Sequence, residues 1–134
     1  MKIVDMHCDT LLEGWRHQDK SLVDGDFSIN LRLLKEHDSL LQFFAIYISR
    51  KELKTTAAYE IFKSMYVYYK KFLSENSDVI KPVYNAKDVA YNKKRGFLSS
   101  LLTIEDGVFI EGKMERIDEV YDMGVRLITP IWNF

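Results

Sequence analysis

Short apolar runs alternate with segments of helical periodicity along this sequence, and this alternation limits the possible folds more than any other feature. Runs typical of buried strands lie at residues 2–6, 39–49, 97–104 and 125–129. Helical patterns lie at residues 30–36, 56–73 and 85–92, and from Met114 to a stop at Gly124. We expect Thr56 to cap the longest of these helices. The order of strands and helices predicts an α/β fold with a parallel sheet and right-handed crossovers.

Two architectures share this order, an open doubly wound sheet and part of a (β/α)8 barrel. The last apolar run is followed directly by Trp132, Asn133 and Phe134. A buried parallel strand needs a neighbour on each side, and no further strand follows this one. We therefore expect the 134 residues to be cut within a single domain.

Composition excludes several classes of protein. Nineteen basic residues against twenty acidic ones give a net charge of −1, which predicts no nucleic-acid partner and no anionic membrane surface. The single cysteine excludes a disulfide framework and fits a reducing compartment. We see neither a signal peptide after Met1 nor a run of about 20 apolar residues. We expect a cytoplasmic protein.

His7 and Asp9 follow directly on the first apolar run. Because side chains alternate along a strand, these two side chains share one face. An imidazole beside a carboxylate suits zinc or another first-row metal. The simpler alternative is a polar strand end whose side chains bond to loop backbone, so the pair alone leaves both interpretations open.

Glu105 strengthens the metal interpretation. It stands just after the third apolar run, so in a barrel it would face the same mouth as His7 and Asp9. A carboxylate in that place can bridge two metal ions roughly 3.5–4 Å apart. The alternative is a turn, because Asp106 and Gly107 are good turn formers after a strand.

Four segments, read together, carry a family resemblance. They are residues 5–10 (Asp-Met-His-Cys-Asp-Thr), 41–47, 104–107 (Ile-Glu-Asp-Gly) and 124–129. In this order and spacing they resemble the membrane (renal) dipeptidase family, peptidase family M19 of the amidohydrolase superfamily. One departure lies in the third segment, where Glu-Gly-Gly is more usual in the family.

The resemblance implies a (β/α)8 barrel that cleaves dipeptides at a binuclear zinc site. Residues 1–134 would be its N-terminal half, with the first four βα units. His7 and Asp9 would bind one zinc, and the catalytic Glu105 would bridge both ions. A hydroxide bridging the ions would attack the scissile carbonyl. The family's two further histidines, its aspartate and its arginine lie in the other half, so this chain alone should be inactive.

Trp132 and Asn133 are the predicted substrate-binding residues. Many relatives place a histidine directly before this asparagine, where it helps to polarise the substrate carbonyl. Here the position is Trp132, which leaves the substrate range open.

Two other functions fit the sequence. A truncated, non-catalytic paralogue would act as a binding or assembly module and form a homo-oligomer through its open sheet edge. A different amidohydrolase-type metal hydrolase is the other, because motifs near a metal are shared more widely than those that select the substrate.

Overall fold

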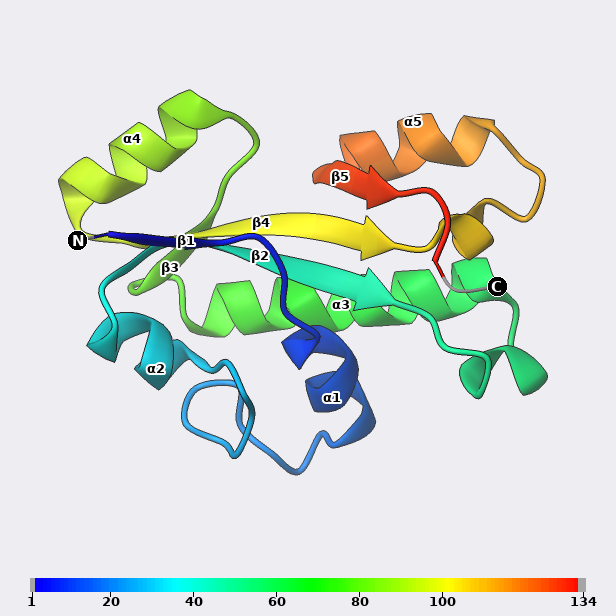
Figure 1. The fold of residues 1–134 in the computed structure, drawn as a ribbon, viewed down its shortest axis with the longest axis horizontal. Coiled ribbons are helices and arrows are strands. Elements are labelled where there is room, and N and C mark those ends of the chain that lie inside the picture. The colour runs from blue at the N-terminus through cyan, green and yellow to red at the C-terminus, as the bar shows by residue number, and fades with distance from the viewer. Residues whose placement is uncertain (1, 133–134) are drawn as a thin grey trace.

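Five parallel strands and five α-helices make up the structure, a computed structural model that describes residues 2–132 (Figure 1). The strands are β1 (Ile3–Asp5), β2 (Ser39–Tyr47), β3 (Ile80–Pro82), β4 (Leu98–Glu105) and β5 (Val125–Thr129). The helices are α1 (Thr10–Arg16), α2 (Leu31–Glu36), α3 (Ala58–Glu75), α4 (Ala86–Arg95) and α5 (Glu115–Asp122), with short 3-10 helices η1 (Glu52–Lys54) and η2 (Gly107–Ile110). Within the part described, no helix is both long and apolar enough to cross a membrane.

Strand β4 lies at the centre of the sheet. One of its edges pairs with β2, from Leu41 opposite Ser99 to Tyr47 opposite Glu105. Its other edge is shared, because β3 pairs with its first residues and β5 with its last ones. Strand β1 pairs with the free edge of β2. All four pairings are parallel, which confirms the predicted α/β fold with a parallel sheet.

The sequence-based prediction missed two elements and misplaced one cap. Strand β3 has only three residues and ends in Pro82, so it is too short to show a period and suits a sheet edge. Helix α1 has seven residues with Gly14 among them. Thr56 does not cap α3, because this helix begins after Ala57 with no side-chain cap bond.

One face of the sheet forms the core against α3. Phe44 of β2 and Ile104 of β4 are buried there. The Phe44 ring lies 6.3 Å from that of Tyr69 and 6.0 Å from that of Phe72, both on α3. The aromatic stripe of α3 is therefore packing surface, as its helical spacing predicts.

The opposite face of the sheet carries exposed apolar side chains. Val4 of β1 is 51% exposed and Leu127 of β5 is 38% exposed, and Met6, just after β1, is 63% exposed. Parallel sheets are ordinarily covered on both faces. This face would be the interior of a closed barrel, which is where such side chains are buried.

Helix α4 offers a local test of these elements. The side chain of its N-cap, Asn85, accepts hydrogen bonds from the backbone N–H groups of Lys87 (2.9 Å) and Asp88 (3.2 Å). We expect Asn85→Ala to lower the free energy of unfolding by about 1 kcal/mol, because both N–H groups lose their acceptor. Asn85→Asp keeps an acceptor and should stay within about 0.5 kcal/mol in the same urea titration. Equal losses in both variants would contradict this assignment of the cap.

Candidate metal centre

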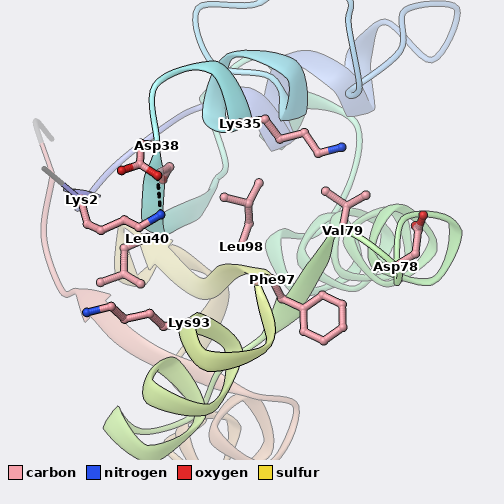
Figure 2. Close-up of a pocket in the computed structure, with 11 residues that line it drawn as sticks. Lys2, Lys35, Asp38, Leu40, Asp78, Val79, Lys93, Phe97 and Leu98 are labelled. Atoms are coloured by element: carbon pink, nitrogen blue, oxygen red, sulfur yellow. Dashed lines mark hydrogen bonds and ion pairs between the residues drawn. The ribbon is translucent and has the colours of Figure 1, made fainter.

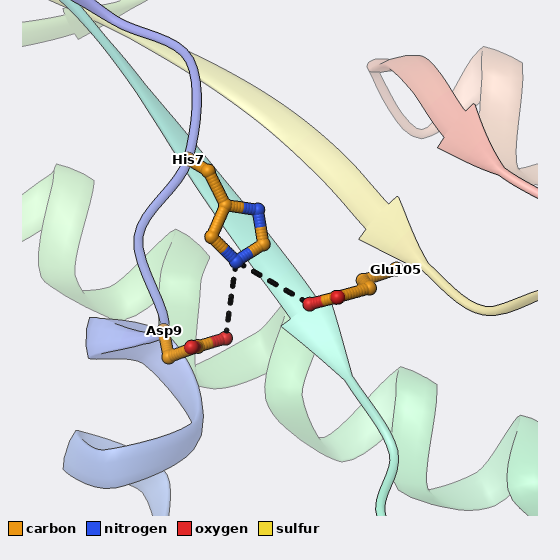
Figure 3. A group of neighbouring side chains, drawn as sticks. All are labelled: His7, Asp9 and Glu105. Carbon is orange, nitrogen blue, oxygen red and sulfur yellow. Dashed lines mark ion pairs between the residues drawn. The ribbon is translucent and has the colours of Figure 1, made fainter. Parts of the chain in front are cut away.

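Three polar side chains converge where β1 and β4 end. The Nε2 atom of His7 lies 3.4 Å from Asp9 Oδ1 and 3.3 Å from Glu105 Oε2 (Figure 3). One potential ligand atom from each of the three residues lies within 4.8 Å of the other two. The structure thus brings together the three residues that the sequence singled out as metal ligands.

The local structure explains why these side chains meet. His7 and Asp9 lie in the short segment between β1 and α1, on either side of Cys8. The Cys8 carbonyl accepts a hydrogen bond from Ala45 N–H (3.1 Å), which continues the pairing of β1 with β2 past the end of β1. Glu105 is the last residue of β4. Both groups are therefore held by backbone pairing to β2, the strand between them.

The two distances that separate His7 from the carboxylates fit a shared metal ion. Ligands about 2.0–2.2 Å from a tetrahedral centre lie roughly 3.3–3.6 Å from one another. The two distances from His7 Nε2 match this spacing. The two carboxylates supply the negative charge that a divalent cation needs, and together with an imidazole nitrogen they form a mixed oxygen and nitrogen set that suits zinc and its first-row neighbours.

The surroundings of Glu105 favour a cation. Its side chain is only 18% exposed. Burial raises the pKa of Glu105, the nearby carboxylates of Asp9 and Asp106 raise it further, and the His7 imidazole acts in the opposite direction. A bound cation would offset both the cost of burying the charged carboxylate of Glu105 and its repulsion by the neighbouring carboxylates.

A pocket of about 270 Å³ opens beside the cluster. His7 and Asp9 line it, together with Glu13 of α1 and the loop residues Phe27 and Ile29. The pocket is bounded by both apolar and charged groups, which is typical of small-molecule sites. It gives a ligand access to the side of the cluster formed by the segment between β1 and α1.

Another pocket, of about 380 Å³, lies at the opposite end of the sheet (Figure 2). Lys2, Lys35 and Lys93 line it beside Asp38 and Asp78, and a Lys2–Asp38 ion pair spans part of it. Lys35 and Lys93 stand in the last turns of α2 and α4, where a positive charge complements the helix dipole. Because sites in parallel α/β folds lie at the carboxyl ends of the strands, we assign function to the cluster and not to this pocket.

The turn predicted at residues 105–107 is made by Asp106 and Gly107, and Glu105 stays a candidate ligand. Asp106 makes the turn. Its φ is 77°, and its side chain accepts a hydrogen bond from Val108 N–H (3.1 Å) at the start of η2. Gly107 donates its N–H to the Pro130 carbonyl at 3.0 Å. Glu105 is left to face the cluster, so it does not serve the turn.

The Cys8 side chain is not part of the cluster of candidate ligands. It is buried in the hydrophobic core. Burial raises the pKa of the Cys8 thiol to about 11, so the thiol stays protonated near neutral pH. It is a core side chain between two candidate ligands.

Sequence reasoning missed Tyr47, the residue paired with Glu105 across the β2–β4 ladder. The rings of Tyr47 and Trp132 meet edge to face with their centroids 5.0 Å apart. Tyr47 is the last residue of β2, so the register of the two strands was the signal that could have found it. Trp132 is 40% exposed beside this end of the sheet. Asn133 lies outside the described residues.

A parallel sheet with candidate metal ligands at the carboxyl ends of its strands is the arrangement that one half of a (β/α)8 barrel would show. Over residues 1–134 the sequence matches the membrane dipeptidase family, peptidase family M19. The chain belongs to this family. No curated protein matches the sequence.

Solved structures share the fold. The chain superposes on dipeptidase AC, a metallopeptidase of family M19, with a TM-score of 0.84 at 19% identity, covering 98% of this chain and 44% of that one. A metallopeptidase from Rhodobacter sphaeroides, liganded with a phosphinate mimic of the dipeptide L-Ala-D-Ala, gives a TM-score of 0.85 at 18% identity, with 98% and 46% covered. The probable dipeptidase PvdM from Pseudomonas aeruginosa gives 0.71 at 13% identity, with 83% and 30% covered.

The chain therefore spans less than half the length of these structures. The partial (β/α)8 barrel predicted from the order of the strands and from the family motifs is confirmed by this agreement in fold.

Proposed function

We propose that this chain supplies three metal ligands and one wall of the substrate site of a zinc-dependent dipeptidase. The single observation that carries the proposal is the cluster of His7, Asp9 and Glu105, with His7 Nε2 3.4 Å and 3.3 Å from the two carboxylates. Family membership supports the choice of reaction. The predicted location in the cytoplasm and the single partial domain over residues 1–134 stay predictions.

The three side chains divide the work. His7 and Asp9 would hold one metal ion. The carboxylate of Glu105, with its two oxygens, would reach both of two bound metal ions. A bound pair of divalent ions supplies polarisation of the scissile carbonyl and activation of water at neutral pH. Backbone pairing with β2 would hold Glu105 and the segment that carries His7 in place before any ion binds.

Trp132 would contact the substrate beside the metal ligands. Its ring packs against Tyr47, which pairs with Glu105, and the residue is 40% exposed. An indole offers a large apolar surface and one hydrogen-bond donor. It cannot supply the charge of a histidine at this position, so we expect the role of Trp132 to be packing against the substrate. Asn133 stays a predicted substrate-binding residue.

Titration of the full chain with Zn²⁺ and Mn²⁺ tests the metal site, and a phosphinate dipeptide mimic tests the substrate site. We expect the mimic to bind the metal-loaded chain and to bind the metal-free chain at least about tenfold more weakly, because a phosphinate oxygen needs the cation as its partner. We expect no hydrolysis of dipeptides by this chain alone. A chain that binds no metal would refute the proposed function. Robust hydrolysis would refute only the expectation that this chain is inactive by itself.

A second candidate function is assembly with another copy of the chain. It is favoured by the apolar side chains of Val4, Met6 and Leu127 on one face of the sheet, all of them exposed. Pairing of two such chains would bury this face. Sedimentation at micromolar concentration decides the question, with a dimer expected from this function and a monomer at all concentrations excluding it. The same face would be covered within a complete barrel, which is why the dipeptidase is our first candidate.

A further inference from the structure

Arg16, in the last turn of α1, ties this helix to the segment that follows β2. Its Nε and Nη2 atoms donate to Glu52 Oε1 at 2.9 Å and 2.7 Å. Nη2 also donates to Ser49 Oγ at 3.1 Å, and Nη1 to Glu13 Oε1 at 3.2 Å. Ser49 in turn donates to the second oxygen of Glu52. One guanidinium thus holds three side chains from two elements.

The network is partly shielded from water. The side chain of Arg16 is 26% exposed and that of Glu52 is 10% exposed. Burial acts to raise the pKa of Glu52, but hydrogen bonds from Ser49 and Arg16 outweigh it and hold this pKa below its ordinary value. A shielded ion pair, in which two N–H groups of the guanidinium fork converge on one carboxylate oxygen, is stronger than the exposed pairs elsewhere on the surface.

Helix α1 needs such an anchor. It has only seven residues, fewer than an isolated helix requires to persist in water. Gly14 weakens it further, and a larger residue there would have to displace the side chains of Leu22 and Tyr68, because an added Cβ would lie 2.5 Å from Leu22 Cδ2 and 2.6 Å from the Tyr68 hydroxyl. Thr10 anchors the first turn through a 2.8 Å hydrogen bond to the Ile29 carbonyl. Arg16 anchors the last turn.

The start of α1 is also where Asp9 stands. Asp9 occupies the N-cap position, but its side chain makes no cap bond. Its carbonyl accepts the first helical hydrogen bond, from Glu13 N–H at 3.2 Å. The direction of its carboxylate therefore follows the seating of α1, and no local hydrogen bond to the helix fixes it.

The hydrogen bonds of Arg16 also connect α1 to the strand next to Glu105. Ser49 and Glu52 follow closely after Tyr47, which pairs with Glu105. Arg16 thereby connects the helix that carries Asp9 to the strand that holds Glu105 in register. We infer that Arg16 is a positioning residue, which sets the separation of Asp9 from Glu105 through its fork on Glu52. This inference rests on the proposed metal site and adds a residue outside the ligand set.

Titration of the full chain with Co²⁺, followed by its visible absorption, tests the inference. Arg16→Lys keeps the charge but loses the fork, and Glu52→Gln keeps the shape but loses the charge. We expect each variant to bind Co²⁺ about tenfold more weakly, in the range found when groups that orient metal ligands are removed. The absorption spectrum of the bound ion should also change. A merely stabilising role would lower the melting temperature and leave affinity and spectrum as they are.

Arg32→Lys is the matched control, because Arg32 forms an exposed ion pair with Glu36 on α2, a helix that carries no candidate ligand. It should stay within about twofold of the unchanged chain in Co²⁺ affinity. The double variant Arg16→Lys/Glu52→Gln should lose no more than the weaker-binding single variant, because the two residues act as one unit.

The outcomes separate this inference from the proposed function. If the unchanged chain binds Co²⁺ and both single variants bind it equally well with the same spectrum, Arg16 does not position Asp9 and the metal site stands. If the unchanged chain binds no Co²⁺, the proposed metal site is wrong and the inference falls with it. Should Arg16→Lys fail to fold, the Co²⁺ affinity and spectrum of Glu52→Gln test the inference in the same way.

Discussion

Glu105→Gln is expected to weaken the binding of Zn²⁺ or Mn²⁺ by more than about 100-fold, because loss of a direct ligand exceeds the 10–100-fold typical of groups that only orient ligands. The amide has nearly the same shape as the carboxylate but carries no charge. It leaves His7 and Asp9 as the only members of the cluster that can bind an ion strongly. Isothermal titration of the metal-free chain measures the effect.

Asp106→Asn makes the same change of charge one residue away and is the matched control. Asparagine has nearly the shape of aspartate, and it keeps an acceptor for the Val108 N–H. We expect its metal affinity to stay within about tenfold of the unchanged chain, below the loss for a true ligand. If both substitutions reduce affinity equally, the effect is one of general charge and Glu105 is not a ligand.

Phe62→Ala is expected to lower the free energy of unfolding by about 3–5 kcal/mol, the range for removing a buried ring. Phe62 has no exposed surface, and its ring lies 5.9 Å from that of Tyr59 and 5.7 Å from that of Phe109. Phe109 belongs to η2, directly after the Glu105 turn. The cavity would therefore open beneath the segment that carries the site. Urea denaturation followed by circular dichroism gives the value.

Val67→Ala, on the same helix, supplies the comparison for this loss. Val67 is 66% exposed, so shortening it should change the stability by no more than about 0.5 kcal/mol. Phe62→Leu should fall between the two, because it fills part of the cavity. A small loss for Phe62→Ala would mean that α3 does not pack on η2 as the structure shows.

The fold was predictable where one period repeats for long enough. The continuous apolar run of β2 and the aromatic stripe of α3 each repeat over several turns or residue pairs, and both elements are where the sequence predicts them. β3 and α1 were missed because three residues ending in Pro82, or seven containing Gly14, show no clear period. Tertiary contacts form these two elements, and such contacts leave little trace in a local pattern.

The candidate site was predictable as a set of residues but not as a network. Alternation along a strand put His7 and Asp9 on one face, and the parallel order of strands brought Glu105 to the same end. No such rule connects Arg16 with Glu52, because their contact depends on how α1 is seated. The pairing of Tyr47 with Glu105 needed the register of two strands, which no single segment contains.

The placement of the candidate ligands also determines when in folding a metal can act. His7 and Asp9 lie near the start of the sequence and Glu105 is the last residue of β4, so the three meet only once β1 and β4 have both joined β2. Forming contacts so distant in the sequence is the slow part of building a parallel sheet. A metal ion therefore cannot nucleate this fold. It would bind the finished sheet, slow its unfolding and raise its stability as the concentration of free metal rises.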